Sequence, residues 1–142
     1  MKKILFIITL GLIILSHNLQ AETVAFAHTV SYHVNRDIDF NEKNYGVGIR
    51  HYINTEEEAN KYITVGGYRN SEYNQTYYAG VGWEWPIGND FQLGVVTGLI
   101  TGYSLGDVLP YVVPIIKYKN ISLVVAPYPE AVYHLTIDLV TF

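Results

Sequence analysis

Two side chains in this sequence have the residue types needed for acyl transfer. His33 lies near the end of the segment "VAFAHTVSYHV", and Ser71 follows Asn70 in "GGYRNSEYNQ". An imidazole beside a hydroxyl can take the proton of the serine or of an acceptor alcohol, which is the minimum for moving an acyl group. One histidine and one serine are also common in ordinary loops. The pair therefore indicates catalysis only if the fold brings the two residues together.

The segments that would position these residues alternate bulky and small side chains with a period of two, as β-strands do. In residues 24–34 the small face includes Ser31 and His33, and the opposite, bulky face carries Phe26, His28, Val30, Tyr32 and Val34. Residues 91–103 repeat this pattern, with glycine on the small face. In a soluble sandwich the face opposite the core would carry charge. A bulky face opposite a small polar one instead predicts a barrel with lipid outside and a narrow interior.

About eight such runs are present, and thirteen tyrosines are available for aromatic girdles at the membrane surfaces. We therefore predict an all-β fold, an eight-stranded antiparallel transmembrane β-barrel of the outer membrane. In the last run Phe142 is in phase with Asp138 rather than with Leu139, so we expect a bulge near its end. The expected strands are residues 24–34, 45–53, 61–70, 76–85, 91–103, 108–117, 120–126 and 131–142.

The N-terminal segment predicts export. Residues 1–21 carry two lysines, an apolar run from Ile4 to Leu15 and a polar stretch that ends at Ala21. This order is typical of a cleaved signal peptide, and the apolar run is shorter than the roughly 20 residues that a spanning helix needs. We expect residues 22–142 to form a single β-barrel domain, located in the outer membrane of a Gram-negative bacterium.

Charge and motif content exclude several other classes of function. Without Lys2 and Lys3, seven of the nine basic residues remain against thirteen acidic ones, so the formal charge changes from −4 to −6 and a nucleic-acid partner is not expected. The acids in "RDIDFNEKN" and "NTEEEANK" are interpreted as solvated loop charge. The histidines lack metal-ligand spacing, and HExxH, P-loop and GxSxG motifs are missing, so neither a metal nor a cofactor is predicted.

The barrel topology places the candidate residues together. If both termini are periplasmic, the first and third strands run outward, so His33, Asn70 and Ser71 reach the same extracellular rim. On the fourth strand Gly80 and Gly82 share the inward face with Tyr78 and Glu84. A buried Glu84 needs a partner such as an inward Arg50, and that pair is interpreted as structural.

Several segments together resemble a known family of enzymes. The order "TVSYHVNRDIDFNEKNYGVG", "GYRNSEYNQTYYAGVGWEW", "LGVVTGLITGY", "LPYVVP" and "PYPEAVY" is similar to that of the PagP family, outer-membrane enzymes that move a palmitoyl chain from a phospholipid to lipid A. The resemblance covers nearly the whole chain after the signal segment. It implies that His33 and Ser71 match an essential histidine and serine of the family. Asn70 stands where the family has aspartate, and an amide can orient an imidazole but cannot stabilise the imidazolium as a carboxylate does.

The same resemblance gives roles to glycines and prolines. It implies that Gly82, with Gly80 above it, forms the floor of a pocket that measures acyl-chain length, because the missing side chains would leave a tube. Pro114 and Pro127 would weaken strand pairing and leave a lateral gap for lipid, since proline cannot donate to a ladder. For Gly94, Gly98 and Gly102 we favour simple relief of crowding in a tightly curved barrel.

Two functions follow from these observations. The first is a monomeric outer-membrane acyltransferase that uses membrane phospholipid and lipopolysaccharide or lipid A. In it His33 activates the acceptor hydroxyl, Asn70 orients it and Ser71 contacts the reacting ester. The second is a non-catalytic small barrel with a structural or surface-binding role, in which Asn70 marks lost chemistry.

Overall fold

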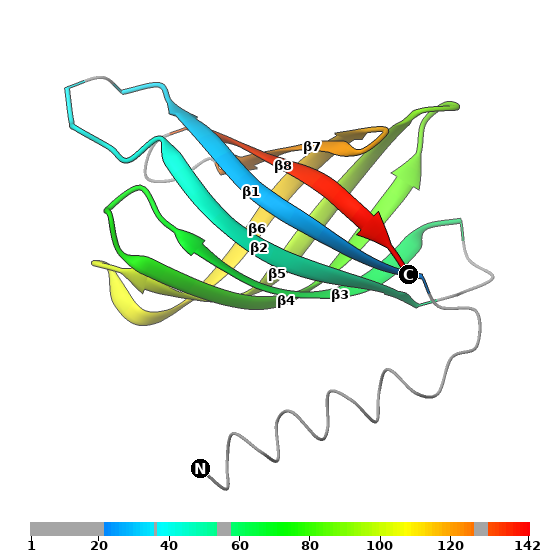
Figure 1. The fold of residues 1–142 in the computed structure, drawn as a ribbon, viewed down its shortest axis with the longest axis horizontal. Helices are drawn as coiled ribbons and strands as arrows, with labels where there is room; N and C mark the ends of the chain where they lie inside the picture. The colour runs from blue at the N-terminus through cyan, green and yellow to red at the C-terminus, as the bar shows by residue number, and fades with distance from the viewer. Residues whose placement is uncertain (1–21, 36, 54–57, 127–130) are drawn as a thin grey trace, which may run out of the picture.

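The computed structural model describes residues 22–35, 37–53, 58–126 and 131–142. They form a closed barrel in which each strand pairs antiparallel with the next and β8 pairs with β1 (Figure 1). The fold prediction is confirmed, and every expected strand is present with bounds that differ by at most two residues. Among the described residues no helix is long and apolar enough to cross a membrane. The strands are β1 Thr23–His33, β2 Lys43–Ile53, β3 Asn60–Arg69, β4 Gln75–Pro86, β5 Phe91–Tyr103, β6 Gly106–Tyr118, β7 Ile121–Ala126 and β8 Val132–Thr141.

The two ends of the barrel differ in their connections. The backbones of Thr23 and Phe142 pair with each other, so the strands begin and finish at one end, which we name the proximal end. It also carries the tight β4–β5 and β6–β7 turns (Figure 1). The opposite end, the distal rim, carries the β1–β2 and β3–β4 connections and the short β5–β6 turn at Ser104 and Leu105. The predicted signal peptide, residues 1–21, lies outside the described residues.

The outer surface of the barrel suits lipid rather than water. Apolar side chains are exposed along the middle of the strands, for example Val47, Val65, Val81, Leu99 and Val112. Exposed aromatic side chains lie toward both ends of the strands, as the girdle prediction requires. Toward the distal rim these are Tyr32, Tyr45, Tyr77 and Tyr133, and toward the proximal end they are Trp85, Phe91 and Tyr118.

The strand β1 does not keep one phase along its length. Its pairing shifts register after His28 on both the β2 and the β8 side. Below the shift Phe26 and His28 are buried, whereas above it His33 is buried and Tyr32 is exposed. The prediction that Phe26 and His28 face lipid is therefore wrong, because a bulge adds a residue and exchanges the two faces of the strand. The inward position of His33 is confirmed.

A second bulge lies in β8, as expected. Ala25 pairs with Val140, but the next residue, Phe26, pairs with Asp138, so Leu139 is the extra residue. Asp138 faces the interior, where it binds Arg50, while Phe142 is exposed beyond the end of the strand. Because of the bulge, Asp138 faces the interior while Phe142, four residues later, is exposed on the outside.

The interior is filled by side chains that include Tyr62, Arg50 and Glu84, which is consistent with the narrow interior that the alternation predicted. Arg50 Nη1 donates to Asp138 Oδ1 at 2.8 Å, and Lys117 Nζ lies 2.9 Å from Asp138 Oδ2. Glu84 accepts a hydrogen bond of 2.9 Å from the Tyr52 hydroxyl. The expected ion pair between Arg50 and Glu84 is therefore replaced by two separate pairs, although both residues do face inward. Arg50 and Lys117 thus have an opposite charge that offsets their desolvation, whereas Glu84 is held by a neutral hydroxyl.

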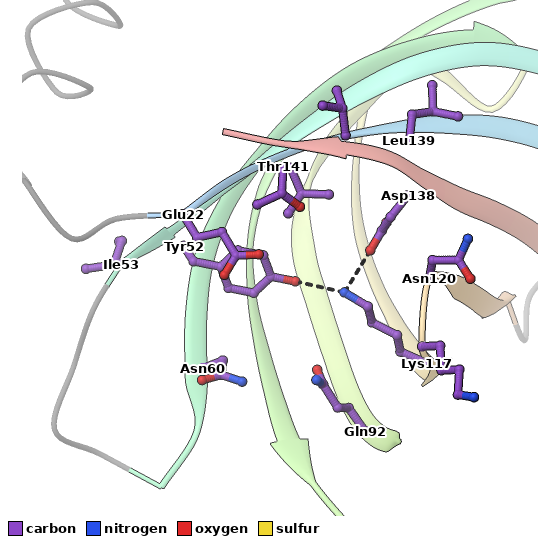
Figure 2. Close-up of a pocket in the computed structure, with 13 residues that line it drawn as sticks. Glu22, Tyr52, Ile53, Asn60, Gln92, Lys117, Asn120, Asp138, Leu139 and Thr141 are labelled. Atoms are coloured by element: carbon purple, nitrogen blue, oxygen red, sulfur yellow. Dashed lines mark hydrogen bonds and ion pairs between the residues drawn. The ribbon is translucent and has the colours of Figure 1, made fainter. Parts of the chain in front are cut away.

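This layer of charges forms the inner wall of a cavity at the proximal end. The cavity has a volume of about 530 Å³ and lies beside Tyr52, Lys117 and Asp138 (Figure 2). Lys117 Nζ donates to the Tyr52 hydroxyl at 3.3 Å, which links the two pairs across the barrel (Figure 2). A connected layer of polar side chains therefore crosses the interior near the proximal end.

Candidate functional site

The structure brings His33 and Ser71 into contact at the distal rim. His33 is the last residue of β1, and Ser71 lies in the turn between β3 and β4. His33 Nε2 is 2.8 Å from Ser71 Oγ. With the imidazole proton on Nδ1, the serine hydroxyl donates to Nε2, which is the ground-state arrangement of a serine activated by a base. Topology alone predicted that the two residues share a rim, and the structure shows that they are hydrogen-bonded.

The imidazole of His33 is held from its remaining sides by the β1–β2 connection. Phe40 stacks on its ring, with the centroids 4.3 Å apart and the planes at 15°. Glu42 Oε1 lies 4.0 Å from Nδ1 and 3.4 Å from the backbone nitrogen of His33. Sequence reasoning missed Glu42, because the acids of this segment were interpreted as solvated loop charge. The pairing of β1 with β2 could have identified it, since an antiparallel hairpin returns the chain to the level of His33.

Asparagine side chains tie this connection to the segment that carries Ser71. The Asn41 backbone nitrogen donates to the Ser71 carbonyl at 2.9 Å, and Asn41 Nδ2 donates to the Asn70 carbonyl at 3.0 Å. Asn44 Nδ2 donates to the Arg69 carbonyl at 2.9 Å. Both asparagines are buried. The distance between His33 and Ser71 is therefore set by backbone contacts on both sides of the pair.

Asn70 uses its side chain to build the turn. Its Oδ1 accepts from the backbone nitrogens of Glu72 and Asn74, at 2.9 and 3.0 Å. Its Nδ2 donates to Thr76 Oγ1 at 2.9 Å and to the Gly102 carbonyl at 2.7 Å. These four bonds occupy both amide hydrogens and both oxygen lone pairs of a side chain that is 0% exposed. The Asn70 side chain therefore fixes the turn that carries Ser71, and its predicted orienting role at the site stays a prediction that these contacts do not support.

Gly82 and Gly80 face the interior, but other side chains occupy the space beside them. A Cβ atom at Gly82 would overlap the ring of Tyr62, and one at Gly80 would lie 2.5 Å from the Thr97 carbonyl oxygen and 2.6 Å from the Tyr111 hydroxyl. The missing side chains thus admit aromatic rings from other strands rather than leaving an open tube. The role of Gly80 and Gly82 in binding an acyl chain stays a prediction, and it requires Tyr62 and Tyr111 to move.

Pro114 marks the end of a strand ladder, as its lack of an N–H predicts. Pairing between β6 and β7 runs from Tyr118 with Ile121 to Ile115 with Val124 and stops just before Pro114. Within the described residues, the distal half of β6 has no partner on its β7 side. The apolar residues Val96, Val113, Ile115 and Val124 lie behind this edge. Pro127, the other proline predicted to admit lipid, lies outside the described residues.

A surface cavity gives access to the His33 side of the pair. It has a volume of about 390 Å³ and is bounded by His33, Phe40 and Glu42, with the side chains of Asn35, Asp37, Ile38 and Asp39 around its mouth. In the part of the chain that the structure covers, no group of three or more His, Asp or Glu side chains is arranged to hold a metal ion. The arrangement at the rim is thus that of a base and a hydroxyl beside a small open cavity.

Taken with the apolar exterior, this geometry defines a small eight-stranded β-barrel of the outer-membrane type with a polar site at its distal rim. The chain is similar in fold to the Yersinia pestis outer membrane protein Ail, whose structure was solved in a phospholipid bilayer nanodisc. The TM-score is 0.50 at 8% sequence identity, over 84% of this chain and 100% of that one, so the likeness concerns the fold alone. No protein-family profile and no curated protein matches the sequence. The resemblance to the PagP family stays a prediction.

Proposed function

We propose that this protein is an outer-membrane acyltransferase that moves a fatty acyl chain from a phospholipid to lipid A or to another lipid acceptor. The observation that carries the proposal is the 2.8 Å contact between His33 Nε2 and Ser71 Oγ. A buried imidazole in contact with a serine hydroxyl, at a rim that faces outer-leaflet lipid, has both the chemistry and the location for this reaction.

In the reaction that fits this contact, Ser71 is the nucleophile. His33 takes the Ser71 proton while Oγ attacks the carbonyl carbon of the phospholipid ester. The imidazolium then gives that proton to the departing lysophospholipid oxygen, which leaves the acyl group on Ser71. An acceptor hydroxyl next gives its proton to His33 and attacks the acyl-serine, and His33 returns the proton to Ser71 Oγ. The direct alternative, in which His33 activates the acceptor without an acyl-serine, uses the same two residues.

The surroundings of the site suit lipid substrates. Exposed Tyr32, Tyr45 and Tyr77 lie on the outer face toward the same rim, where aromatic side chains mark the membrane surface. Within the described residues, the ladder that ends at Pro114 leaves part of β6 without a β7 partner, next to apolar residues of the interior. Both features support a substrate that arrives from the outer leaflet. The proposal includes export by the signal peptide, residence in the outer membrane of a Gram-negative bacterium, and action as a monomer.

Mass spectrometry of lipid A from cells that express the protein tests the proposal. We expect lipid A with one additional acyl chain in cells that carry the wild type, and unchanged lipid A with Ser71→Ala or His33→Ala. Ser104→Ala is the matched control, since Ser104 is a rim serine that bonds Glu72 rather than a histidine. Unchanged lipid A with the wild type, together with unchanged phospholipid acyl composition, would argue against acyl transfer.

One observation favours the second function, a non-catalytic barrel with a structural or surface-binding role. The space beside Gly82 holds the ring of Tyr62, so the resting interior offers no open channel for an acyl chain there. On that proposal, cells that lack the protein have a weaker outer membrane, and Ser71→Ala restores it as well as the wild type does. Detergent sensitivity of cells complemented with Ser71→Ala separates the two functions.

A further inference from the structure

The carboxylate of Glu42 occupies the place that a third member of a catalytic group would take. Glu42 Oε1 is 4.0 Å from Nδ1 of His33, and Ser71 Oγ is 2.8 Å from Nε2 of the same ring. The carboxylate and the hydroxyl therefore approach opposite edges of one imidazole. In hydrolases and transferases this order lets the acid fix the imidazole tautomer and stabilise the imidazolium that forms during the reaction.

The position of Glu42 is fixed by the backbone around it. The Ser31 nitrogen donates to the Glu42 carbonyl at 2.9 Å, and the His33 nitrogen donates to the Glu42 carboxylate at 3.4 Å. Asn41, the residue before Glu42, is bonded to the Ser71 carbonyl at 2.9 Å. One short segment thus contacts both the strand that carries His33 and the turn that carries Ser71.

The exposure of the two groups also suits this role. The His33 side chain is 2% exposed, whereas that of Glu42 is 37% exposed and borders the cavity of about 390 Å³. Glu42 therefore keeps part of its hydration in the resting state. The carboxylate oxygen, 4.0 Å from Nδ1, lies beyond hydrogen-bond distance in the resting state, and catalytic hydrogen bonds are often long before substrate binds.

We infer that Glu42 is the positioning residue of this site, and that it supplies the carboxylate that the Asn70 position lacks. The inference rests on the proposed acyl transfer, and it assigns the acid to the β1–β2 connection instead of the β3–β4 turn. The amide of Asn70 is fully engaged by Glu72, Asn74, Thr76 and Gly102 and so has no capacity left for His33. An amide at position 70 is therefore compatible with a carboxylate at the site.

The first test measures acyl transfer by the purified full chain, folded in detergent, with a short-chain phospholipid as donor. We expect Glu42→Gln to lower kcat by roughly 10²- to 10⁴-fold with little change in KM, and Glu42→Asp to recover part of the loss. Added formate should restore part of the activity of Glu42→Ala, because the vacated site opens to the cavity. Asp107→Asn, which removes an exposed charge at the distal end of β6 outside this cavity, should stay within about twofold of the wild type.

The second test does not depend on turnover. Nitrogen-15 NMR of the histidine rings in micelles should show His33 of the wild type protonated on Nδ1 alone, and a mixture of tautomers in Glu42→Gln. If Glu42→Gln keeps both the wild-type kcat and the wild-type tautomer while His33→Ala is inactive, Glu42 is not the positioning residue and acyl transfer still stands. If the wild type transfers no acyl chain, the proposed function fails, and an unchanged tautomer in Glu42→Gln overturns the inference as well.

Discussion

The distal rim and the barrel interior use polar residues in opposite ways. In the interior, Arg50 and Lys117 share Asp138, and Tyr52 binds Glu84, so each charged group bonds another interior side chain. At the rim, asparagine side chains bind backbone carbonyls, and a hydroxyl and an imidazole meet beside an open cavity. The difference indicates that the interior is the scaffold, and it supports the proposal that the chemistry takes place at the rim.

The largest expected effect comes from breaking the interior network. Asp138→Leu would leave Arg50 and Lys117 without their shared carboxylate, and an unpaired buried charge costs about 3 to 5 kcal/mol. Asp90→Asn is the control, since Asp90 meets Lys119 at 4.0 Å on the exposed proximal surface, where loss of a pair changes stability little. Urea unfolding followed by the heat-dependent shift on gels measures both. Equal stability of the two variants would show that the interior charges do not support the barrel.

Gly82→Met tests whether the interior also takes part in the site. The methionine would overlap the ring of Tyr62, and overpacking of this kind costs roughly 1 to 3 kcal/mol. We expect lower stability and an unchanged acyl profile in lipid mass spectrometry. Gly98→Met is the control, because a Cβ there meets the Ala79 carbonyl and the Gly80 backbone. A preference for shorter chains in Gly82→Met alone would place the acyl pocket inside the barrel, as the resemblance implies.

Asn70→Asp tests whether residue 70 acts in the chemistry at the rim or only holds the turn that carries Ser71. A carboxylate there cannot donate to Thr76, and it would face the Gly102 carbonyl at the 2.7 Å now spanned by a hydrogen bond. Loss of buried hydrogen bonds costs about 1 to 3 kcal/mol, so we expect the turn to be less stable and transfer to be slower. Asn74→Asp, which changes an exposed amide of the same turn, serves as the control. Faster acyl transfer by Asn70→Asp would indicate that the carboxylate of the site belongs at position 70 and not at Glu42.

The smallest expected effect concerns the β6–β7 edge. Pro114→Ala restores an N–H where the ladder now ends, so it should let pairing extend by a residue or two and change stability by less than about 1 kcal/mol. If lipid enters beside this edge, acyl transfer by Pro114→Ala should be slower, whereas a small fluorophosphonate probe should label Ser71 at the wild-type rate. Pro110→Ala, nearer the distal end of β6, is the comparison variant. Faster transfer in Pro114→Ala would exclude entry at this edge.

The strands were predictable from sequence because lipid on one side and a crowded lumen on the other impose a period of two. The same rule failed for Phe26 and His28, since a bulge after His28 exchanges the faces, and alternation contains no sign of an inserted residue. The meeting of His33 and Ser71 followed from topology, which fixes the rim that each strand reaches. Glu42 and the contacts of Asn70 depend on loop geometry, which periodicity does not describe.

The reactivity of Ser71 is the central claim, and intact-mass measurement after treatment with a fluorophosphonate lipid analogue tests it most directly. We expect the folded wild type to gain a single adduct, mapped to Ser71, and His33→Ala and Ser71→Ala to gain none. Ser104, which is exposed at the same rim and hydrogen-bonded to Glu72, should remain unmodified. A folded wild type that gains no adduct, or that reacts at Ser104 as readily as at Ser71, would contradict the account.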